Sequence, residues 1–276
     1  MISLKKEIEN ADMVVVGIGA ELQAKNLIPY QAKEIAQFYQ ELGMTKYGEV
    51  CAHANEEEFT YIRDLYYFYY IVTQKIPTIY DRLEKILAGK NFFIITSNTD
   101  DLIYSSTLDE TKIVAPCGTR RYFQCSKGCE KNLYPAKELM YAKLKEFEET
   151  GETSKIGCGL CKAPLEFNIR TKDTADHYVE EGYLAQWGKY TKWLQGTLNK
   201  RFLVLELGEG FEQPNLFHWP FERLVYLNQK AKLIRVHSKL SQIGEELKER
   251  AVSVPMFAID FLMEQELDDK NEGKNC

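Results

Sequence analysis

Four cysteines give this chain its clearest chemical signal. Cys125 and Cys129 form a C-x3-C pair, and Cys158 and Cys161 form a C-x2-C pair, with no other cysteine between the two pairs. Two such pairs on tight turns supply the four thiolates that one tetrahedral zinc ion takes. The alternative is that they are four small hydrophobic residues, but the paired spacing favours zinc. The pattern predicts a structural zinc ribbon, which says little by itself about function.

The composition is that of an ordinary folded protein. The chain has 276 residues, a 45% hydrophobic fraction and 8 prolines, which suits one large domain with a smaller insertion. Its net charge of −6 argues against nucleic-acid binding, which needs a basic surface. No apolar run approaches the roughly 20 residues that cross a bilayer, and the polar N-terminus lacks the apolar core of a signal peptide. The cysteines outside the ribbon are scattered. We expect a cytoplasmic protein that binds neither membranes nor nucleic acid.

Apolar runs rich in β-branched and aromatic residues predict the strands of the main domain. Continuous runs of this kind belong to parallel strands that are covered on both faces. Each run ends in small or polar residues, and helical stretches lie between them, which predicts an α/β fold with a doubly wound, Rossmann-like parallel sheet. The four runs are 13–20, 91–96, 202–207 and 232–237.

Two modules are expected to interrupt the main domain. Residues 28–87 read as an inserted helical module, and 120–166 read as the zinc-ribbon module. The polar tail 268–276 is expected to be disordered. The Rossmann-like domain is then assembled from the remaining three segments, 1–27, 88–119 and 167–267.

The helical module is rich in tyrosine. Apolar and aromatic side chains recur at helical spacing between Leu65 and Val72. The tyrosines could form a ligand-binding surface or could pack helices against a core, and packing is the favoured interpretation. The tyrosines concerned are Tyr61, Tyr66, Tyr67, Tyr69 and Tyr70.

The first predicted strand ends in a glycine turn. Gly17, Gly19 and Ala20 would let backbone amides and a helix N-terminus approach a pyrophosphate. The third glycine of the full dinucleotide fingerprint is absent, so the turn alone is not specific. The order of motifs is more specific: this turn, then T-S-N-T-D at 96–100, then the ribbon, then L-G-E-G-F at 207–211. In that order the chain resembles the sirtuin family.

The resemblance covers about residues 10–240 and is strongest to the macrodomain-linked sirtuins of bacteria. Three stretches carry it: 122–126 leading into the ribbon, 167–170 after it, and 205–211 with Pro214 following. The family cleaves the nicotinamide–ribose bond of NAD and passes the ADP-ribosyl group to an acyl-lysine oxygen or another acceptor. The resemblance therefore implies NAD as cofactor and a protein substrate, for which a lipoylated or acylated carrier protein is the expected kind.

Individual positions carry the implied roles. Asn98 and Asp100 match the family residues at the nicotinamide end of the cofactor, and Asn168 and Arg170 match positions facing the same pocket. For Arg170, a surface ion pair with a neighbouring carboxylate stays an open alternative. The catalytic set expected from the resemblance is Asn98, Asp100, Cys117, Asn168 and Arg170. The cofactor-binding set is Gly17, Gly19, Ala20, Glu21, Asn98, Asp100, Gly208, Glu209, Gly210 and His237.

Several positions depart from the family pattern. Cys117 replaces the histidine or glutamine of the family, and is interpreted either as a nucleophile or as a small buried residue without that role. Glu21 and Glu209 put carboxylates where the pyrophosphate is expected, and a carboxylate within roughly 4 Å of phosphate repels it. His237 replaces the family asparagine near the adenine ribose. The departures suggest a degenerate active site.

Two functions remain open on this reading. The first is an NAD-dependent protein ADP-ribosyltransferase or deacylase that releases nicotinamide. The second is a catalytically inactive sirtuin-like protein that binds a nucleotide or a partner and acts as a sensor or scaffold. A zinc-ribbon nucleic-acid binder is disfavoured by the acidic charge.

Overall fold

The computed structural model describes residues 2–53, 56–76 and 78–267, so the predicted disordered tail lies outside the described residues. A six-stranded parallel sheet forms the main body. Its strands are β1 (Met13–Ile18), β2 (Asn91–Thr96), β3 (Ile113–Val114), β7 (Phe202–Leu207), β8 (Ala231–Val236) and β9 (Ala251–Val254). They lie in the order β3-β2-β1-β7-β8-β9.

The strand order reverses at the centre of the sheet. β1 pairs in parallel with both β2 and β7, so the chain winds outward on one side and then on the other. Every residue of β1 and β7 is buried, which explains why both read as uninterrupted apolar runs. In open sheets of this kind, ligands bind beyond the carboxyl ends of the strands at such a switch point.

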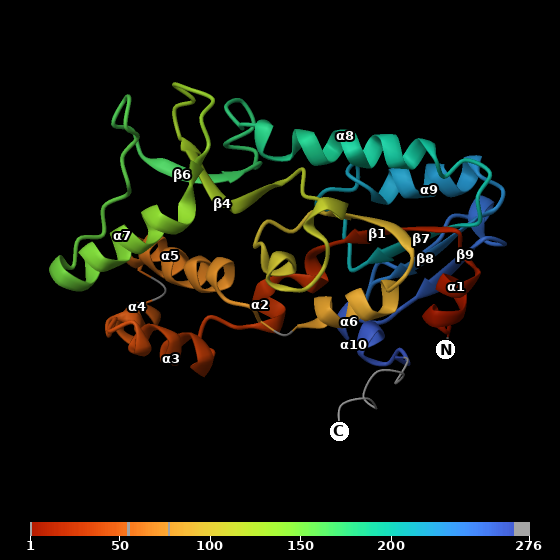
Figure 1. Ribbon diagram of the computed structural model, residues 1–276, viewed down its shortest axis with the longest axis horizontal. Coiled ribbons are helices and arrows are strands. Elements are labelled where there is room, and N and C mark those ends of the chain that lie inside the picture. Colours follow the sequence, from red (N-terminus) through yellow and green to blue (C-terminus); the bar gives the residue numbers. More distant parts are fainter. Residues whose placement is uncertain (1, 54–55, 77, 268–276) are drawn as a thin grey trace.

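Helices cover both faces of the sheet, as Figure 1 shows. α8 (Glu181–Gln195) and α9 (His218–Leu227) cover one face, where Tyr190 and Phe221 share a core with Val15 and Val204. On the other face, Leu4, Leu83 and Phe261 pack with alternate strand residues. These three come from α1 (Leu4–Asn10), α6 (Ile79–Leu87) and α10 (Ala258–Met263). The predicted doubly wound α/β fold is confirmed.

A second unit lies beside the end of the main sheet (Figure 1). It contains a three-stranded antiparallel sheet in the order β5-β4-β6, formed by β5 (Tyr134–Pro135), β4 (Gly118–Cys125) and β6 (Leu165–Ile169). α7 (Ala136–Thr150) follows β5 and packs against α5 (Glu57–Thr73). The remaining helices are α2 (Ala24–Leu27), α3 (Lys33–Glu41) and α4 (Tyr47–Ala52), with 3-10 turns η1 (Ala20–Leu22), η2 (Leu102–Ser105), η3 (Glu110–Lys112) and η4 (Glu245–Leu247).

The tyrosines of α5 pack into a core. Tyr66 and Tyr67 are almost fully buried, and neighbouring rings meet edge to face. Their hydroxyls donate hydrogen bonds, from Tyr66 to Glu148 Oε1 at 2.6 Å and from Tyr67 to the carbonyl of Ile28 at 2.6 Å. Burying a phenol is tolerable when its hydroxyl is satisfied in this way. The packing interpretation of these tyrosines is confirmed.

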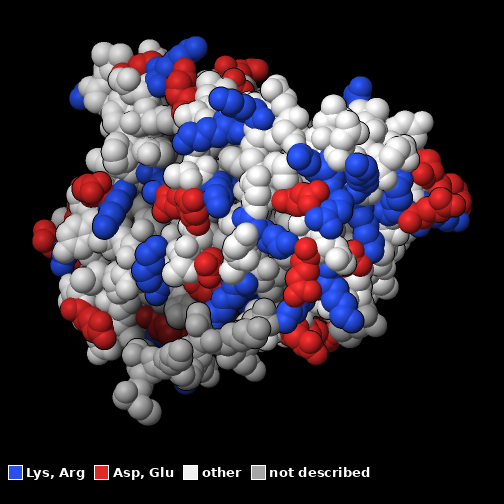
Figure 2. Space-filling view, turned by 45° about the vertical axis from the view of Figure 1, so that its right-hand side comes forward, with Lys and Arg blue, Asp and Glu red and all other residues white. Residues whose placement is uncertain are grey.

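The surface is mixed in charge. Figure 2 shows one face on which lysine and arginine side chains are interspersed with aspartate and glutamate. Within the described part of the chain, no helix is both long and apolar enough to span a membrane. The domain boundaries drawn from the sequence stay a prediction. α6, which they assign to the helical module, packs against α10, and Arg82 Nε donates to the carbonyl of Leu262 at 2.7 Å.

Candidate functional site

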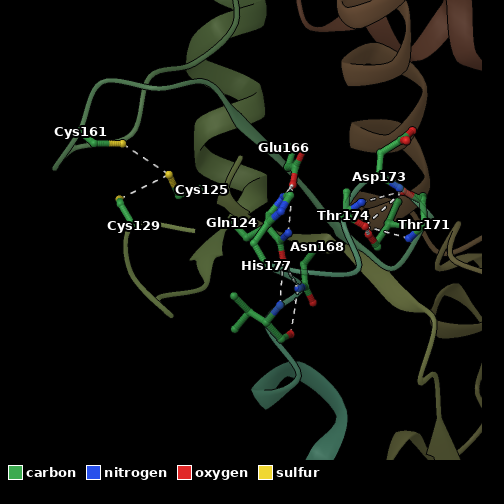
Figure 3. Close-up of polar contacts among 12 residues, drawn as sticks. Gln124, Cys125, Cys129, Cys161, Glu166, Asn168, Thr171, Asp173, Thr174 and His177 are labelled. Carbon is green, nitrogen blue, oxygen red and sulfur yellow. Dashed lines mark hydrogen bonds and ion pairs between the residues drawn. The ribbon is translucent and has the colours of Figure 1, made fainter. Parts of the chain in front are cut away.

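The four ribbon cysteines converge on one point. Their sulfur atoms all lie within 4.8 Å of one another. The Sγ of Cys125 is 3.4 Å from that of Cys129 and 3.5 Å from that of Cys161, as Figure 3 shows. Tetrahedral zinc with bonds of about 2.3 Å separates its sulfurs by roughly 3.8 Å. The donor set and its spacing therefore fit a structural zinc ion bound by Cys125, Cys129, Cys158 and Cys161.

A polar network joins the ribbon sheet to the segment that leads into α8 (Figure 3). Asn168 on β6 donates its Nδ2 to Gln124 Oε1 at 2.7 Å and to the carbonyl of Val179 at 3.0 Å. Gln124 in turn donates to Glu166 at 3.0 Å, and Glu166 contacts His177 at 2.7 Å. Asn168 thus positions the backbone here, while its Oδ1 is buried without a partner. Its predicted catalytic role stays a prediction.

The two glycines at the end of the first strand are required by the protein's own packing. Gly17 lies within β1, where an added Cβ would come 2.5 Å from the Phe217 ring. At Gly19 an added Cβ would come 2.4 Å from the Cα of Glu209. Glycine is needed at both positions whether or not a phosphate binds. Ala20 begins the 3-10 turn that follows.

Asn98 and Asp100 lie beside the switch point, beyond the end of β2. The Nδ2 of Asn98 donates to the carbonyl of Gly19 at 3.0 Å. Among the described residues, the Oδ1 of Asn98 is enclosed and has no hydrogen-bond partner. Asp100 accepts hydrogen bonds from the backbone N–H groups of Ala24 at 2.8 Å and Leu102 at 3.0 Å. Burial raises the pKa of Asp100, and these two donors oppose the rise. Asp100 therefore holds the loop that begins α2, and the Oδ1 of Asn98 is a buried acceptor without a hydrogen-bond partner among the described residues.

The Glu21 carboxylate points away from the glycine turn. It accepts from the backbone N–H and the hydroxyl of Ser238, at 2.9 and 2.6 Å, and from the N–H of Ala258 at 2.8 Å. Ala258 begins α10, so the charge also lies at a helix N-terminus. Three donors satisfy this buried carboxylate, and it ties the end of β1 to the segment after β8. It carries less repulsion toward a phosphate than the sequence suggests.

Unlike the carboxylate of Glu21, the carboxylate of Glu209 lies against the glycine turn. Its Oε2 accepts from Ser97 Oγ at 2.7 Å and lies 2.6 Å from where a Cβ of Gly19 would be. Burial raises the pKa of Glu209 to about 7, with the Glu206 charge adding to the rise and the Ser97 bond opposing it. About half of the Glu209 carboxyl groups are then neutral at pH 7. The residue places a titrating group directly over the glycine turn.

His237 and the following turn line the other side of this end of the sheet. The Nδ1 of His237 accepts from the N–H groups of Lys239 and Leu240, both at 3.0 Å. This fixes the ring proton on Nε2, which lies 3.9 Å from where a Cβ of Gly210 would be. Although Nδ1 is 3.4 Å from Glu21, it carries no proton to share in this tautomer. Gly208 has φ +65°, and an added Cβ would come 2.5 Å from the Cβ of Glu21.

Cys117 lies between β3 and β4 and is buried. Burial raises the pKa of the Cys117 thiol to about 11; the Glu209 charge adds to the rise, and Arg170 opposes it. The thiol is therefore protonated at neutral pH and is not activated as a nucleophile. Arg170 is exposed, and its backbone N–H donates to the carbonyl of Cys117 at 2.9 Å. Among the described residues, the Arg170 side chain makes no ion pair, and Glu166 pairs with His177 instead.

Two neighbouring residues belong to this site although sequence reasoning passed over them. Asp101 has φ +65° and accepts from Thr119 Oγ1 at 2.7 Å and from the N–H of Arg120 at 2.6 Å. Burial raises the pKa of Asp101 to about 7. The acidic pair a few residues after a buried strand was the available signal for Asp101. No local pattern marks Arg120, whose environment depends on tertiary packing.

The arrangement defines a class of protein. A parallel sheet with glycine turns at its switch point, beside a module stapled by four cysteines, is a Rossmann-type α/β protein with a zinc-ribbon-like module. No protein-family model matches the chain. It is 24% identical over 259 residues to a protein ADP-ribosyltransferase of Staphylococcus aureus, covering 90% of this chain and 81% of that protein.

Further similarities agree with this one. The chain is 27% identical over 256 residues to a probable bifunctional ADP-ribose hydrolase/ADP-ribosyltransferase of Fusarium oxysporum f. sp. cubense, of whose length it spans 42%. The fold matches a Sir2 homologue solved with NAD at a TM-score of 0.54 and 14% identity, covering 94% of this chain and 90% of that one. A structure on sirtuin substrate affinity matches at a TM-score of 0.53 and 15% identity, covering 94% of each chain. The chain therefore has the fold of the sirtuins.

Proposed function

We propose that the protein is an NAD-dependent protein ADP-ribosyltransferase of sirtuin type that releases nicotinamide, with a structural zinc ion in its ribbon. The observation that carries the proposal is the enclosed, unpartnered Oδ1 of Asn98 at the switch point of the sheet. The similarity to two ADP-ribosyltransferases supports the reaction type. Deacylation is the related reaction of the same site, and the acceptor is a protein, with a lipoylated or acylated carrier as the first kind to test.

NAD, when bound, supplies a glycosidic bond whose cleavage releases nicotinamide and makes the ADP-ribosyl group transferable. The residues around the glycine turn have separable roles toward it. Asn98 accepts a hydrogen bond from the ligand, and Asp100 holds the loop before α2 through Ala24. His237 presents Nε2–H beside Gly210 as a donor for a ligand hydroxyl. These groups fit a polar ligand lying across the ends of β1, β2 and β7.

Glu209 and Cys117 set the conditions of the reaction. Glu209 is compatible with a pyrophosphate when its carboxyl is neutral, because the neutral form removes the repulsion and adds an O–H donor. The protonated Cys117 thiol cannot serve as a general base near pH 7. We therefore expect slow turnover that does not depend on a base at this position.

A second function follows from the same two residues. A carboxylate over Gly19 and a thiol in place of a base would also suit a catalytically inactive protein that binds a nucleotide or partner as a sensor or scaffold. This protein would bind NAD and return it intact. Under either function, we propose a cytoplasmic location for the protein.

The two functions are separated by incubating zinc-loaded protein with labelled NAD and an acylated or lipoylated carrier protein. Free nicotinamide and protein-bound ADP-ribose are measured together. The transferase proposal predicts both products, and predicts that Asn98→Ala lowers the rate about a hundredfold by removing a positioning contact. Asn132→Ala is the matched control, because Asn132 is exposed on the ribbon, where its side chain donates a hydrogen bond to Glu130.

The result is decisive in either direction. Bound NAD recovered intact after long incubation, with every carrier unmodified, overturns the transferase proposal and leaves the sensor. Equal rates for Asn98→Ala and Asn132→Ala would show that the reaction occurs elsewhere on the protein.

A further inference from the structure

Arg120 is a charged side chain that the protein itself leaves without a partner. It lies on β4, and its backbone N–H donates to Asp101. Within the described part of the chain, its guanidinium makes no hydrogen bond and no ion pair, and its Nε is enclosed. A buried donor without a partner destabilises the folded state, and it does so more strongly when it is charged.

Aromatic rings hold this guanidinium in place. Its central carbon lies 3.7 Å from the centre of the Phe68 ring on α5 and 5.1 Å from that of Phe167 on β6. Stacking of this kind stabilises the cation and fixes the plane of its N–H groups without using any of them. The residue is only half-buried, so the terminal nitrogens keep contact with solvent. The Arg120 guanidinium is therefore held in one orientation, is charged, and has terminal N–H groups that can donate to a ligand.

The surrounding carboxylates do not take up these donors. Asp64, Asp100 and Asp101 lie near enough to favour the charged form, while burial lowers the pKa of Arg120. Asp64 accepts from Arg63 at 3.2 Å. Asp100 accepts from two backbone amides, and Asp101 accepts from Thr119 and from the Arg120 amide. These carboxylates stabilise the charge of Arg120 by long-range electrostatic attraction but accept no hydrogen bond from its guanidinium.

We propose that Arg120 is the receptor for an oxyanion group, a carboxylate or a phosphate, of a ligand that enters between α5, β6 and the loop held by Asp100. A guanidinium fork binds two oxygens of such a group at once, and this pairing is among the strongest hydrogen-bonded contacts in proteins. The inference concerns the same part of the molecule as the proposed function, since Arg120 lies next to Asp101 and the loop held by Asp100, and it does not require the reaction.

Binding of small probes to the zinc-loaded protein tests this assignment. Nicotinate and nicotinamide are a matched pair, because nicotinate carries a carboxylate where nicotinamide carries a neutral carboxamide. Inorganic phosphate tests the second kind of oxyanion. We expect wild-type protein to bind one oxyanion, nicotinate or phosphate, at least tenfold more tightly than nicotinamide. Arg120→Gln should abolish that preference and leave nicotinamide binding unchanged.

Arg121→Gln is the matched control. It removes the same charge one residue away, but Arg121 is exposed and paired with Glu110 at 2.9 Å, so the preference should persist. Arg120→Lys should recover part of the affinity, and this keeps the test valid if Arg120→Gln folds poorly.

Each outcome has one meaning. If the wild-type protein binds nicotinate most tightly, the group that Arg120 binds is a carboxylate on a ring. If it binds phosphate most tightly, that group is a phosphate. No preference in the wild type, or equal loss in the Arg120 and Arg121 variants, overturns the inference. If the protein cleaves NAD but shows no preference for an oxyanion, the inference about Arg120 is refuted and the proposed function stands. If it prefers an oxyanion but does not cleave NAD, the inference stands and the proposed function is refuted.

Discussion

Replacing Glu209 with glutamine should change how the stability of the protein depends on pH. Burial raises the pKa of this carboxyl from its ordinary 4.5 to about 7, so the folded state binds the proton more tightly than the unfolded state. The penalty for ionising it is absent below pH 4.5, grows as pH rises toward 7 and is complete above 7. A rise of this size corresponds to about 3 kcal/mol of unfolding free energy.

Glu209→Gln keeps the shape and removes the charge, so it should stabilise the protein by about 3 kcal/mol at pH 8 and about 1 kcal/mol at pH 5. Urea unfolding followed by tryptophan fluorescence at pH 5, 6, 7 and 8 measures this difference, and the chain has 3 tryptophans. Glu212→Gln is the control, since Glu212 is exposed in the same turn and its difference should stay near zero. All other titrating groups are shared, so the difference between variant and wild type isolates Glu209.

A constant difference between Glu209→Gln and wild type across this pH range would refute the reasoning, because it would mean that the carboxyl is already ionised in the folded protein at pH 5. The same variant tests the relation of Glu209 to a phosphate ligand. If Glu209 faces the pyrophosphate, NAD should bind the variant about tenfold more tightly at pH 8, where removing a nearby like charge is worth about 1.4 kcal/mol. Unchanged affinity at pH 8 would separate Glu209 from the ligand.

Other predictions concern the zinc ion and two buried side chains. Cys158→Ser should lower the zinc content below one per chain and loosen the ribbon, while Cys51→Ser should change neither; full zinc content in Cys158→Ser by metal analysis would contradict the four-cysteine site. Glu21→Ala should destabilise the protein by about 2–4 kcal/mol, because three donors lose their acceptor, whereas the exposed Glu34→Ala should cost less than 0.5 kcal/mol in the same unfolding assay. Cys117, with its pKa raised to about 11, should be alkylated about a hundredfold more slowly than an exposed thiol at pH 8 in the folded protein; fast labelling detected by mass spectrometry would show an activated thiolate.

The sequence alone determined the features that depend on local pattern. The apolar runs at 13–18 and 202–207 specify buried parallel strands, since every position along them is covered on both faces. The paired spacing of the cysteines specifies the ribbon, because two short turns bring the sulfurs together. These signals are contained within a few neighbouring residues and survive without knowledge of the rest of the chain.

Only the tertiary structure decided what the polar groups of the site do. Glu21 and Glu209 look alike in the sequence, as two carboxylates beside glycines. One meets the amides of Ser238 and Ala258, more than two hundred residues away, and the other meets Ser97 and covers Gly19.

Tertiary packing also decides the roles of Gly17 and Arg120. Gly17 suggests a phosphate turn from its neighbours, but the ring of Phe217 is what excludes a side chain there. Arg120 shows nothing unusual in the sequence, and its Nε becomes an enclosed donor without a partner among the described residues because Phe68 and Phe167 pack around the guanidinium. The direction, burial and partners of a side chain are set by residues distant in the chain, and for that reason the sequence could not predict the electrostatics of these side chains.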